Sequence, residues 1–195
     1  MKHETISLNT KKMFATSLKK LLEKKPLSKI SVSEIVSDCG VNRKTFYYHF
    51  ENINELLKWM LRQEAIEVVK TMDMNSDYEK SILFVLDYID NNEEIIKNIY
   101  SIGKNELKHF FYEDFTEIMR SVIENNMHDA KISLPDDFTD FLVKFYTEAI
   151  TGLLQEWIVD KSVRNKEKTV QYIQLILHGS ITNTLKAAAE KYPPV

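Results

Sequence analysis

A short segment before residue 50 brings together side chains that could recognise a polyanion. Arg43 and Lys44 are followed by the phenols Tyr47 and Tyr48. If the segment is helical, Arg43 lies one turn from Tyr47 and Lys44 one turn from Tyr48, so that all four share one exposed face. That face opens at the N-terminus of the helix, where the helix dipole and the free N–H groups favour phosphate.

These residue types match the two kinds of contact that proteins make with duplex DNA. Arginine and lysine can reach guanine edges in the major groove, whereas tyrosine hydroxyls and His49 can contact phosphates. We therefore expect double-stranded DNA as a partner. The alternative is a small helical subdomain whose basic face is only solvated.

The neighbouring sequence predicts the elements that position this helix. Ser31 and Glu34 have the spacing of a capping box, which starts a short helix. Gly40 tolerates positive φ and ends that helix, and Asn42 can cap the next one, residues 43–49. Two short helices joined by such a turn form the helix-turn-helix plan. Its small core is expected to contain the apolar residues Ile35, Val36, Val41, Phe46 and Phe50.

Apolar residues at helical spacing predict an all-α fold of about nine helices. Only 4 Gly and 4 Pro occur in 195 residues, which favours long helices. Pro26 ends the first helix, and Asn52 starts one that runs to about Met72. The other helices are expected near residues 82–89, 95–99, 107–127, 138–159 and 169–189, with a loop from Asp129 to Pro135.

The charge distribution divides the chain near residue 60. Residues 1–60 carry 11 Lys or Arg and 6 Asp or Glu, whereas residues 61–195 carry 15 and 23. A basic N-terminal segment joined to an acidic remainder suits a protein that contacts nucleic acid only through its N-terminal segment. We expect a helix-turn-helix DNA-binding domain at 1–60 and a helical effector-binding and dimerisation domain at 61–195.

Composition also predicts where the protein works. It is 44% hydrophobic and 28% charged, which is ordinary for a soluble globular chain. The single cysteine, Cys39, fits a reducing compartment. No apolar run approaches the ~20 residues that span a bilayer, and the polar N-terminus lacks a signal-peptide core. The sequence therefore predicts a cytoplasmic protein without a membrane partner.

Enzymatic chemistry finds no support in the sequence. His3, His109, His128 and His178 are scattered, and no histidine pair or cysteine cluster with metal-ligand spacing occurs. A phosphate-binding glycine loop and a nucleophile elbow are also missing. We expect no catalytic residue, no metal and no cofactor.

A family resemblance lies in the string Gly-Val-Asn-Arg-Lys-Thr-Phe-Tyr-Tyr-His-Phe, residues 40–50, followed by Glu-Leu-Leu at 55–57. It closely resembles the signature of the TetR family of transcriptional regulators, over about 30 residues. The resemblance implies that residues 43–49 form the recognition helix. It implies that Thr45, Tyr47 and His49 touch the DNA backbone and that Arg43, Lys44 and Tyr48 face the groove. The full set expected to contact DNA is Ser33, Asn42, Arg43, Lys44, Thr45, Tyr47, Tyr48 and His49.

Two positions depart from the family pattern. Lys44 replaces the small residue that is common there, so that no base preference follows from the resemblance. Ile53 stands where many members place a lysine that meets phosphate at the start of the next helix. Either the contact is lost and binding is weaker, or Lys58 or the N-terminal lysines replace it.

Residues 24–30, Lys-Lys-Pro-Leu-Ser-Lys-Ile, and residues 152–157, Gly-Leu-Leu-Gln-Glu-Trp, also resemble a subgroup that includes activators of dihydroxyacetone kinase operons. This raises activation, or a partner-dependent coactivator, as an alternative to simple repression.

For the C-terminal part, the resemblance implies ligand sensing and homodimerisation. Aromatic residues could line an apolar pocket with polar tips, although most could equally be core. The expected pocket residues are Phe84, Tyr88, Tyr100, Phe111, Phe115, Phe145 and Trp157. The last two long helices are the family's usual dimer interface. Small residues that would let those helices approach closely are Ala149, Gly152, Gly179, Ser180, Ala187 and Ala188.

Two hypotheses follow. The first is a homodimer that reads a palindromic operator with recognition helices about one DNA turn, ~34 Å, apart. A small-molecule effector would shift the helix that begins at Ile53 and so change that separation. The second is a coactivator whose C-terminal domain binds another protein.

Overall fold

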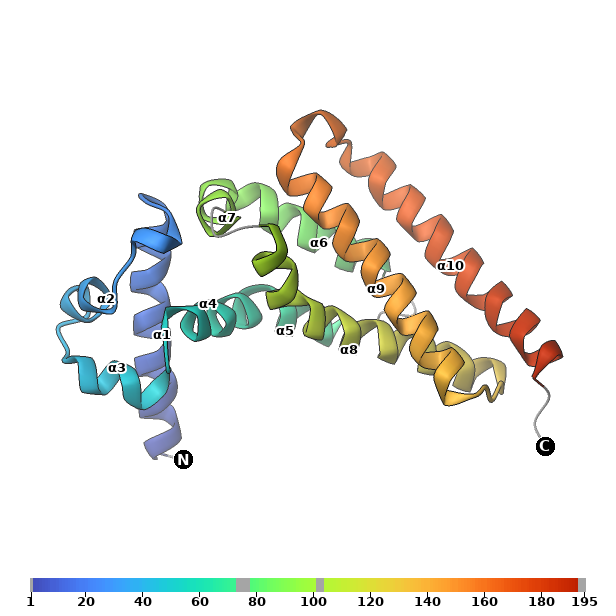
Figure 1. Ribbon diagram of the computed structural model, residues 1–195, viewed down its shortest axis with the longest axis horizontal. Coiled ribbons are helices and arrows are strands. Elements are labelled where there is room, and N and C mark those ends of the chain that lie inside the picture. Colours follow the sequence, from blue (N-terminus) through green and yellow to red (C-terminus); the bar gives the residue numbers. More distant parts are fainter. Residues whose placement is uncertain (1, 73–77, 101–103, 193–195) are drawn as a thin grey trace. The chain divides into compact units, whose positions relative to one another are not determined.

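The computed structural model describes residues 2–72, 78–100 and 104–192, and the regular elements within these ranges are all helical (Figure 1). The α-helices are α1 (Lys2–Leu22), α2 (Val32–Asp38), α3 (Arg43–His49), α4 (Ile53–Leu61), α5 (Glu67–Thr71), α6 (Tyr78–Asn91), α7 (Glu93–Tyr100), α8 (Lys104–Ala130), α9 (Asp136–Val159) and α10 (Lys166–Lys191). Short 3-10 turns lie at Leu27–Lys29 and Lys161–Val163. The prediction of an all-α fold is confirmed.

The helix that begins at Ile53 changes its hydrogen-bond register partway along. α4 passes without a break into the π-helix η2 (Arg62–Ile66), and α5 follows directly. Counted as one rod, these three segments give the described residues nine helices, as the sequence predicts. π turns are rare insertions in α-helices and are frequent at functional positions. Periodicity alone predicts only a continuous helix here, because the apolar side chains stay on one face across the turn.

The chain forms two compact units. The first comprises residues 1–68 with 90–107, and the second comprises 69–89 with 108–195. Each unit is described by itself. The division expected at residue 60 stays a prediction, and the first unit also contains α7, which comes much later in the sequence.

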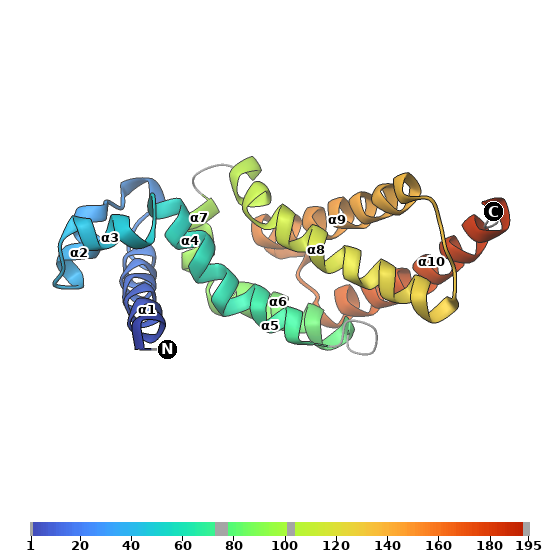
Figure 2. The same ribbon diagram turned by 90° about the horizontal axis from the view of Figure 1, so that it is seen from below.

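The first unit is built around α1. Both views show α2 and α3 beside α1 (Figures 1 and 2). Phe14 and Leu18 of α1 are fully buried, and the Phe14 ring packs on Phe46 in the small core of the helix-turn-helix. Of the predicted core residues, Ile35, Val36, Phe46 and Phe50 are buried and Val41 is half-buried. α7 packs on α1 as well, and the Asn98 side-chain amide donates to the Leu22 carbonyl at 2.8 Å.

The turn between α2 and α3 is a Schellman motif. The Gly40 N–H donates to the Ser37 carbonyl at 3.2 Å, and the Val41 N–H donates to the Val36 carbonyl at 3.0 Å. This pair of bonds requires a left-handed residue between α2 and Val41, and Gly40 has φ +66°. Glycine is favoured there because a Cβ would strain that conformation.

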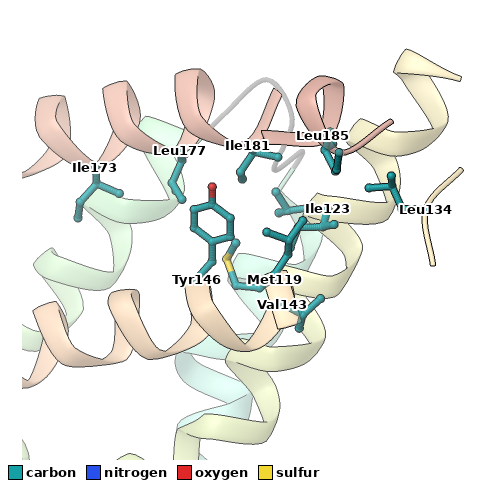
Figure 3. Packing of buried hydrophobic residues seen from close by; sticks show 12 residues of the cluster. Met119, Ile123, Leu134, Val143, Tyr146, Ile173, Leu177, Ile181 and Leu185 are labelled. Atoms are coloured by element: carbon teal, nitrogen blue, oxygen red, sulfur yellow. The ribbon is translucent and has the colours of Figure 1, made fainter. Parts of the chain in front are cut away.

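The second unit has a core shared by α8, α9 and α10. Buried apolar residues from all three helices form one cluster, with Met119 and Ile123 from α8, Val143 from α9, and Leu177 and Ile181 from α10 among them (Figure 3). Tyr146 points its hydroxyl toward α10, and this oxygen lies 2.9 Å from Ser180 Oγ.

Three contacts show that α9 and α10 run antiparallel. The Phe138 and Tyr192 rings lie 5.8 Å apart at one end of the pair. Tyr146 meets Ser180 along the shared face, and at the other end the Arg164 guanidinium donates to the Trp157 carbonyl at 2.8 Å. Within the described ranges, none of the helices combines the length and apolar character that a bilayer crossing requires.

Candidate nucleic-acid interface

The N-terminus of α3 is held by the side chain that the sequence predicts. Asn42 Oδ1 accepts from the Thr45 backbone N–H at 3.0 Å and lies 3.2 Å from the Thr45 hydroxyl. The cap satisfies one of the backbone donors left free at a helix start. Arg43 and Lys44 are exposed in the first turn, directly after the cap.

α3 is anchored through one fully buried aromatic ring. Phe46 is 0% exposed, and its ring meets that of Phe14 edge-on at 5.3 Å. Because α3 has only seven residues, burying Phe46 decides which way the opposite face points. That face carries Tyr47, 56% exposed, and Tyr48, 78% exposed. The exposed face of two cations and two phenols predicted from spacing is therefore present on α3.

Ser33 of α2 meets α3 through Arg43. The Arg43 guanidinium donates a hydrogen bond to the Ser33 hydroxyl. This contact brings together two residues that the sequence places ten positions apart. It restrains a long, mobile side chain at the junction of α2 and α3. An arginine restrained before it meets a ligand loses less conformational entropy on binding.

His49 lies at the last turn of α3 and is half-buried. Its Nδ1 is 3.5 Å from Ser7 Oγ, and its ring meets those of Phe14 and Tyr48 edge-on. Burial, and then the charge of Lys11, hold the pKa of His49 below its ordinary value. The shift favours the neutral imidazole, which carries one N–H donor.

Ser7 and Lys11 were not predicted to lie beside α3. Lys11 Nζ stands 5.6 Å from the centroid of the Phe50 ring. The signal was present in the sequence: Ser7, Lys11 and Phe14 are spaced by four and three residues and so share one face of α1. Because Phe14 packs on Phe46, Ser7 and Lys11 on the same face of α1 also lie next to α3.

The structure also shows the surroundings of Ile53, the position at which the sequence departs from the family pattern. Ile53 is half-buried at the first position of α4, and it borders an open groove together with Tyr47, Asn52 and Asn54. Asn52 Oδ1 caps α4 by accepting from the Glu55 N–H at 3.0 Å. The start of α4 therefore presents amides and backbone N–H groups in place of a lysine.

The aromatic residues predicted to form a ligand pocket do not gather in one place. Phe115 and Trp157 line an apolar cavity in the second unit, whereas Phe84 and Tyr88 are half-buried on α6 and do not line it. Phe145 is 57% exposed and stacks on Phe141. Tyr100 belongs to the first unit, and the side chain of Phe111 lies outside the described residues. Ligand contact by these seven residues stays a prediction.

Among the described residues, no three His, Cys, Asp or Glu side chains gather where they could share a metal ion. The features that stand out on the first unit are the capped helix α3, with its exposed basic and aromatic face, and the glycine turn before it. Together they have the architecture of a helix-turn-helix DNA-binding regulator.

Comparison with known proteins agrees with this architecture. Residues 17–60 match the family described as bacterial regulatory proteins, tetR family, and residues 76–179 match a transcriptional regulator C-terminal region. The chain is 30% identical over 156 residues to the HTH-type dhaKLM operon transcriptional activator DhaS of Lactococcus lactis subsp. lactis strain IL1403. That match covers 78% of this chain and 81% of the relative.

Solved structures give the same result. A dihydroxyacetone kinase operon activator DhaS superimposes with a TM-score of 0.61 at 26% identity, covering 94% of this chain and 97% of the other. A TetR transcriptional regulator from Streptococcus agalactiae 2603V shares the fold, with a TM-score of 0.56 at 19% identity over 91% of this chain and 98% of the other.

The chain belongs to the TetR family of transcriptional regulators. The resemblance seen in residues 40–57 is confirmed, and so is the likeness to activators of dihydroxyacetone kinase operons. Members of this family are DNA-binding proteins rather than enzymes, which confirms the prediction about catalysis.

The capping box that starts α2 gives a pH-dependent prediction. Lys25, the Ser31 N–H and the Ser31 hydroxyl all donate to the Glu34 carboxylate. These bonds, that from Lys25 first, hold the pKa of Glu34 at about 2, below its ordinary 4.5. A lowered folded-state pKa stabilises the fold above the unfolded value, and this stabilisation is lost as pH falls through the folded value.

We therefore expect Glu34→Gln, which keeps a cap but removes the charge, to lower the midpoint of thermal unfolding at pH 7. The difference between wild type and variant should shrink as pH falls from about 4.5 toward about 2. Circular dichroism melts across that range measure it. A difference that stays constant with pH would contradict the assigned cause.

Proposed function

We propose that this regulator binds a palindromic operator as a homodimer through α3. The observation that carries the proposal is the exposed face of α3, where Arg43, Lys44 and Tyr48 stand opposite the buried Phe46. An α-helix of this kind fits the major groove, where arginine and lysine recognise guanine. Arg43, Lys44 and Tyr48 are assigned to the base edges.

The contacts to the sugar-phosphate backbone are assigned to the residues around that face. They are Ser33, Asn42, Thr45, Tyr47 and His49. Asn42 and Ser33 act through their neighbours as well, because Asn42 caps α3 and Ser33 binds the Arg43 guanidinium. Since operator DNA is the target, we also infer that the protein works in the cytoplasm.

Substitution of the two cations tests DNA binding directly. Arg43→Ala should weaken binding to a duplex from the region upstream of the protein's own gene by about 1–3 kcal/mol. Lys44→Ala should also weaken it and should flatten the dependence of log K on log salt concentration, because a cation in the groove also neutralises nearby phosphate charge and its loss reduces the release of counterions. Fluorescence anisotropy over a salt series measures both effects.

Lys168→Ala is the matched control, because Lys168 is an exposed lysine of α10, in the other unit. It should leave affinity and salt slope unchanged. Association that does not depend on salt, or equal losses in all three variants, would rule out α3 as the recognition helix.

Homodimerisation is supported by exposed apolar side chains on α9 and α10. Phe141 and Phe145 lie one turn apart on α9, and Tyr172, Leu175 and Ile176 share one face of α10. Leu175 is 74% exposed. The exposed face of α10 lies opposite the buried stripe of the same helix, so folding of one chain leaves it uncovered. An apolar face on two adjacent helices suits an isologous four-helix interface with a second copy.

We expect wild type to have the mass of a dimer and Phe145→Glu to have that of a monomer, because the interface would bury an unpaired carboxylate. Light scattering after gel filtration gives the mass, and circular dichroism shows that the helices persist. Asn125→Glu adds the same charge at an exposed site on α8 and should remain dimeric. Two variants of equal mass would contradict this interface.

Modulation by a ligand in the second unit completes the proposal, with the helix from Ile53 as the element that a ligand would shift. A protein partner is the second candidate. It is favoured by the similarity to a relative named as a transcriptional activator, because an activator must contact something besides DNA.

Fractionated extract separates the two candidates. Operator affinity of the purified protein is measured with the dialysable fraction of a host extract and with the dialysed protein fraction. A small-molecule effector predicts a change with the dialysable fraction only, since affinity changes only when the added component binds the two states differently. A change with the protein fraction alone would replace the ligand-modulated function with the coactivator function.

A further inference from the structure

Hydrogen-bond donors from two helices of the first unit gather beside the last turn of α3. His49 Nδ1 lies 3.5 Å from the hydroxyl oxygen of Ser7. Lys11 Nζ lies 5.6 Å from the centroid of the ring of Phe50, the residue that follows His49. Ser7 and Lys11 are one turn apart on α1 and share one side of it. Ser7, Lys11 and His49 are together called the α1–α3 donor group.

The α1–α3 donor group carries the positive charge of Lys11. Among the side chains that the structure describes, no carboxylate pairs with this ammonium. Ser7, Lys11 and His49 are each half-buried, so none of them is sealed inside the core. Burial, and then the charge of Lys11, lower the pKa of His49, so the ammonium lies close enough to act on the imidazole. A cation with two neutral donors beside it favours an anion as ligand.

The helical period gives the position of this group relative to the exposed face of α3. Phe46 is buried toward α1, and Lys44 and Tyr48 lie on the opposite side of the helix. At roughly 3.6 residues per turn, Tyr47 falls on one flank of that exposed face and His49 on the other. A helix in the major groove has a sugar-phosphate backbone along each flank. The α1–α3 donor group therefore lies on the flank away from Tyr47.

This placement bears on the lysine that is missing at Ile53. Ile53 borders the groove beside Tyr47, so it belongs to the flank opposite the α1–α3 donor group. Lys58, one candidate to replace the missing lysine, is half-buried and already interacts with another group of the protein. Lys11 stands beside α3, but on the other flank. It would therefore add a phosphate contact on the second strand rather than restore the one lost at Ile53.

We propose that Ser7 and Lys11 of α1, together with His49 of α3, bind one backbone phosphate of the operator on the strand opposite the one that Tyr47 meets. Lys11 supplies the charge, and the Ser7 hydroxyl and the His49 imidazole supply an O–H and an N–H. The inference rests on the proposed operator binding, to which it adds two residues outside the α2–α3 motif. In this arrangement α1 orients α3 through its buried face and meets DNA at its edge.

Removal of the Lys11 charge is the first test. Lys11→Met keeps an unbranched apolar stem over Phe50, and it should lower the slope of log K against log salt by about 0.9, the value of one phosphate contact. Affinity should fall by the same factor on the operator and on an unrelated duplex, because phosphates carry no sequence information. Lys11→Arg should keep the slope, and Ser7→Ala should weaken binding without changing it. Fluorescence anisotropy over a salt series measures these effects.

Lys12→Met is the matched control, because it removes the same charge one residue further along α1. Lys12 is exposed and lies on a different side of α1 from Ser7 and Lys11. It should leave the salt slope unchanged. On the free protein, proton NMR should show a higher pKa for His49 in Lys11→Met and an unchanged one in Lys12→Met, since only the first removes the nearby cation. Circular dichroism verifies that both variants are folded.

Uncharged phosphates in the DNA locate the contact. Single phosphates of the duplex are replaced in turn by methylphosphonate, and binding of wild type and of Lys11→Met is compared at each position. At the phosphate that Lys11 meets, the replacement should weaken wild type but cost Lys11→Met little more, because the same contact is already lost. At all other positions the two losses should add.

Non-additive losses at such a phosphate, with a salt slope lowered in Lys11→Met alone, support the contact. Additive losses at every phosphate, or equal slopes in Lys11→Met and Lys12→Met, would overturn it. If Arg43→Ala still weakens binding in that case, operator recognition by α3 stands without the α1 contact, whereas a wild type that binds no duplex overturns both. Saturable binding of inorganic phosphate at His49 with additive losses on DNA would assign the group to a free anion and also overturn the DNA contact.

Discussion

The edge-on packing of Phe46 against Phe14 is the contact on which the orientation of α3 and its exposed face depends. α3 has seven residues, too few to be stable as an isolated helix. Its orientation must therefore come from tertiary packing, and burying one phenylalanine contributes roughly 1.5–3 kcal/mol. Because Phe46 faces α1, the cations and phenols on the other side of α3 face outward. The direction of this exposed face thus follows from a contact within the core.

Local hydrogen bonds define the orientation of α3 relative to α2 more tightly than packing alone. The Asn42 cap begins α3, and the Schellman turn at Gly40 ends α2, so the angle between the two helices is defined on both sides of the turn. Ser33 then holds Arg43 at the same junction. Each of these bonds is individually modest, about 1 kcal/mol. Together they orient the cations before any DNA is present.

The long helices of the second unit carry apolar side chains on more than one face. Its long helices bury one stripe each, and α9 and α10 keep a second apolar stripe exposed that suits a second copy of the chain. Where α5, α6, α8, α9 and α10 meet, the side chains do not fill the space completely.

The sequence by itself determined the helices and the residues on α3. Capping at Ser31, Asn42 and Asn52, the Gly40 turn and the 3.6-residue spacing of apolar side chains are local properties, so the α2–α3 boundaries and the exposed face of α3 were predicted closely. Only the tertiary structure showed the π turn at 62–66, the position of Ser7 and Lys11 beside His49, and the cavity around Trp157. Aromatic residues spread over four helices could not be sorted into core, cavity and exposed face from spacing, because each helix offers several faces to different neighbours. Phe145 and Trp157 share α9 and a predicted role, yet one is exposed and the other is buried at the cavity wall, since what decides between them is which helix packs on which side of α9.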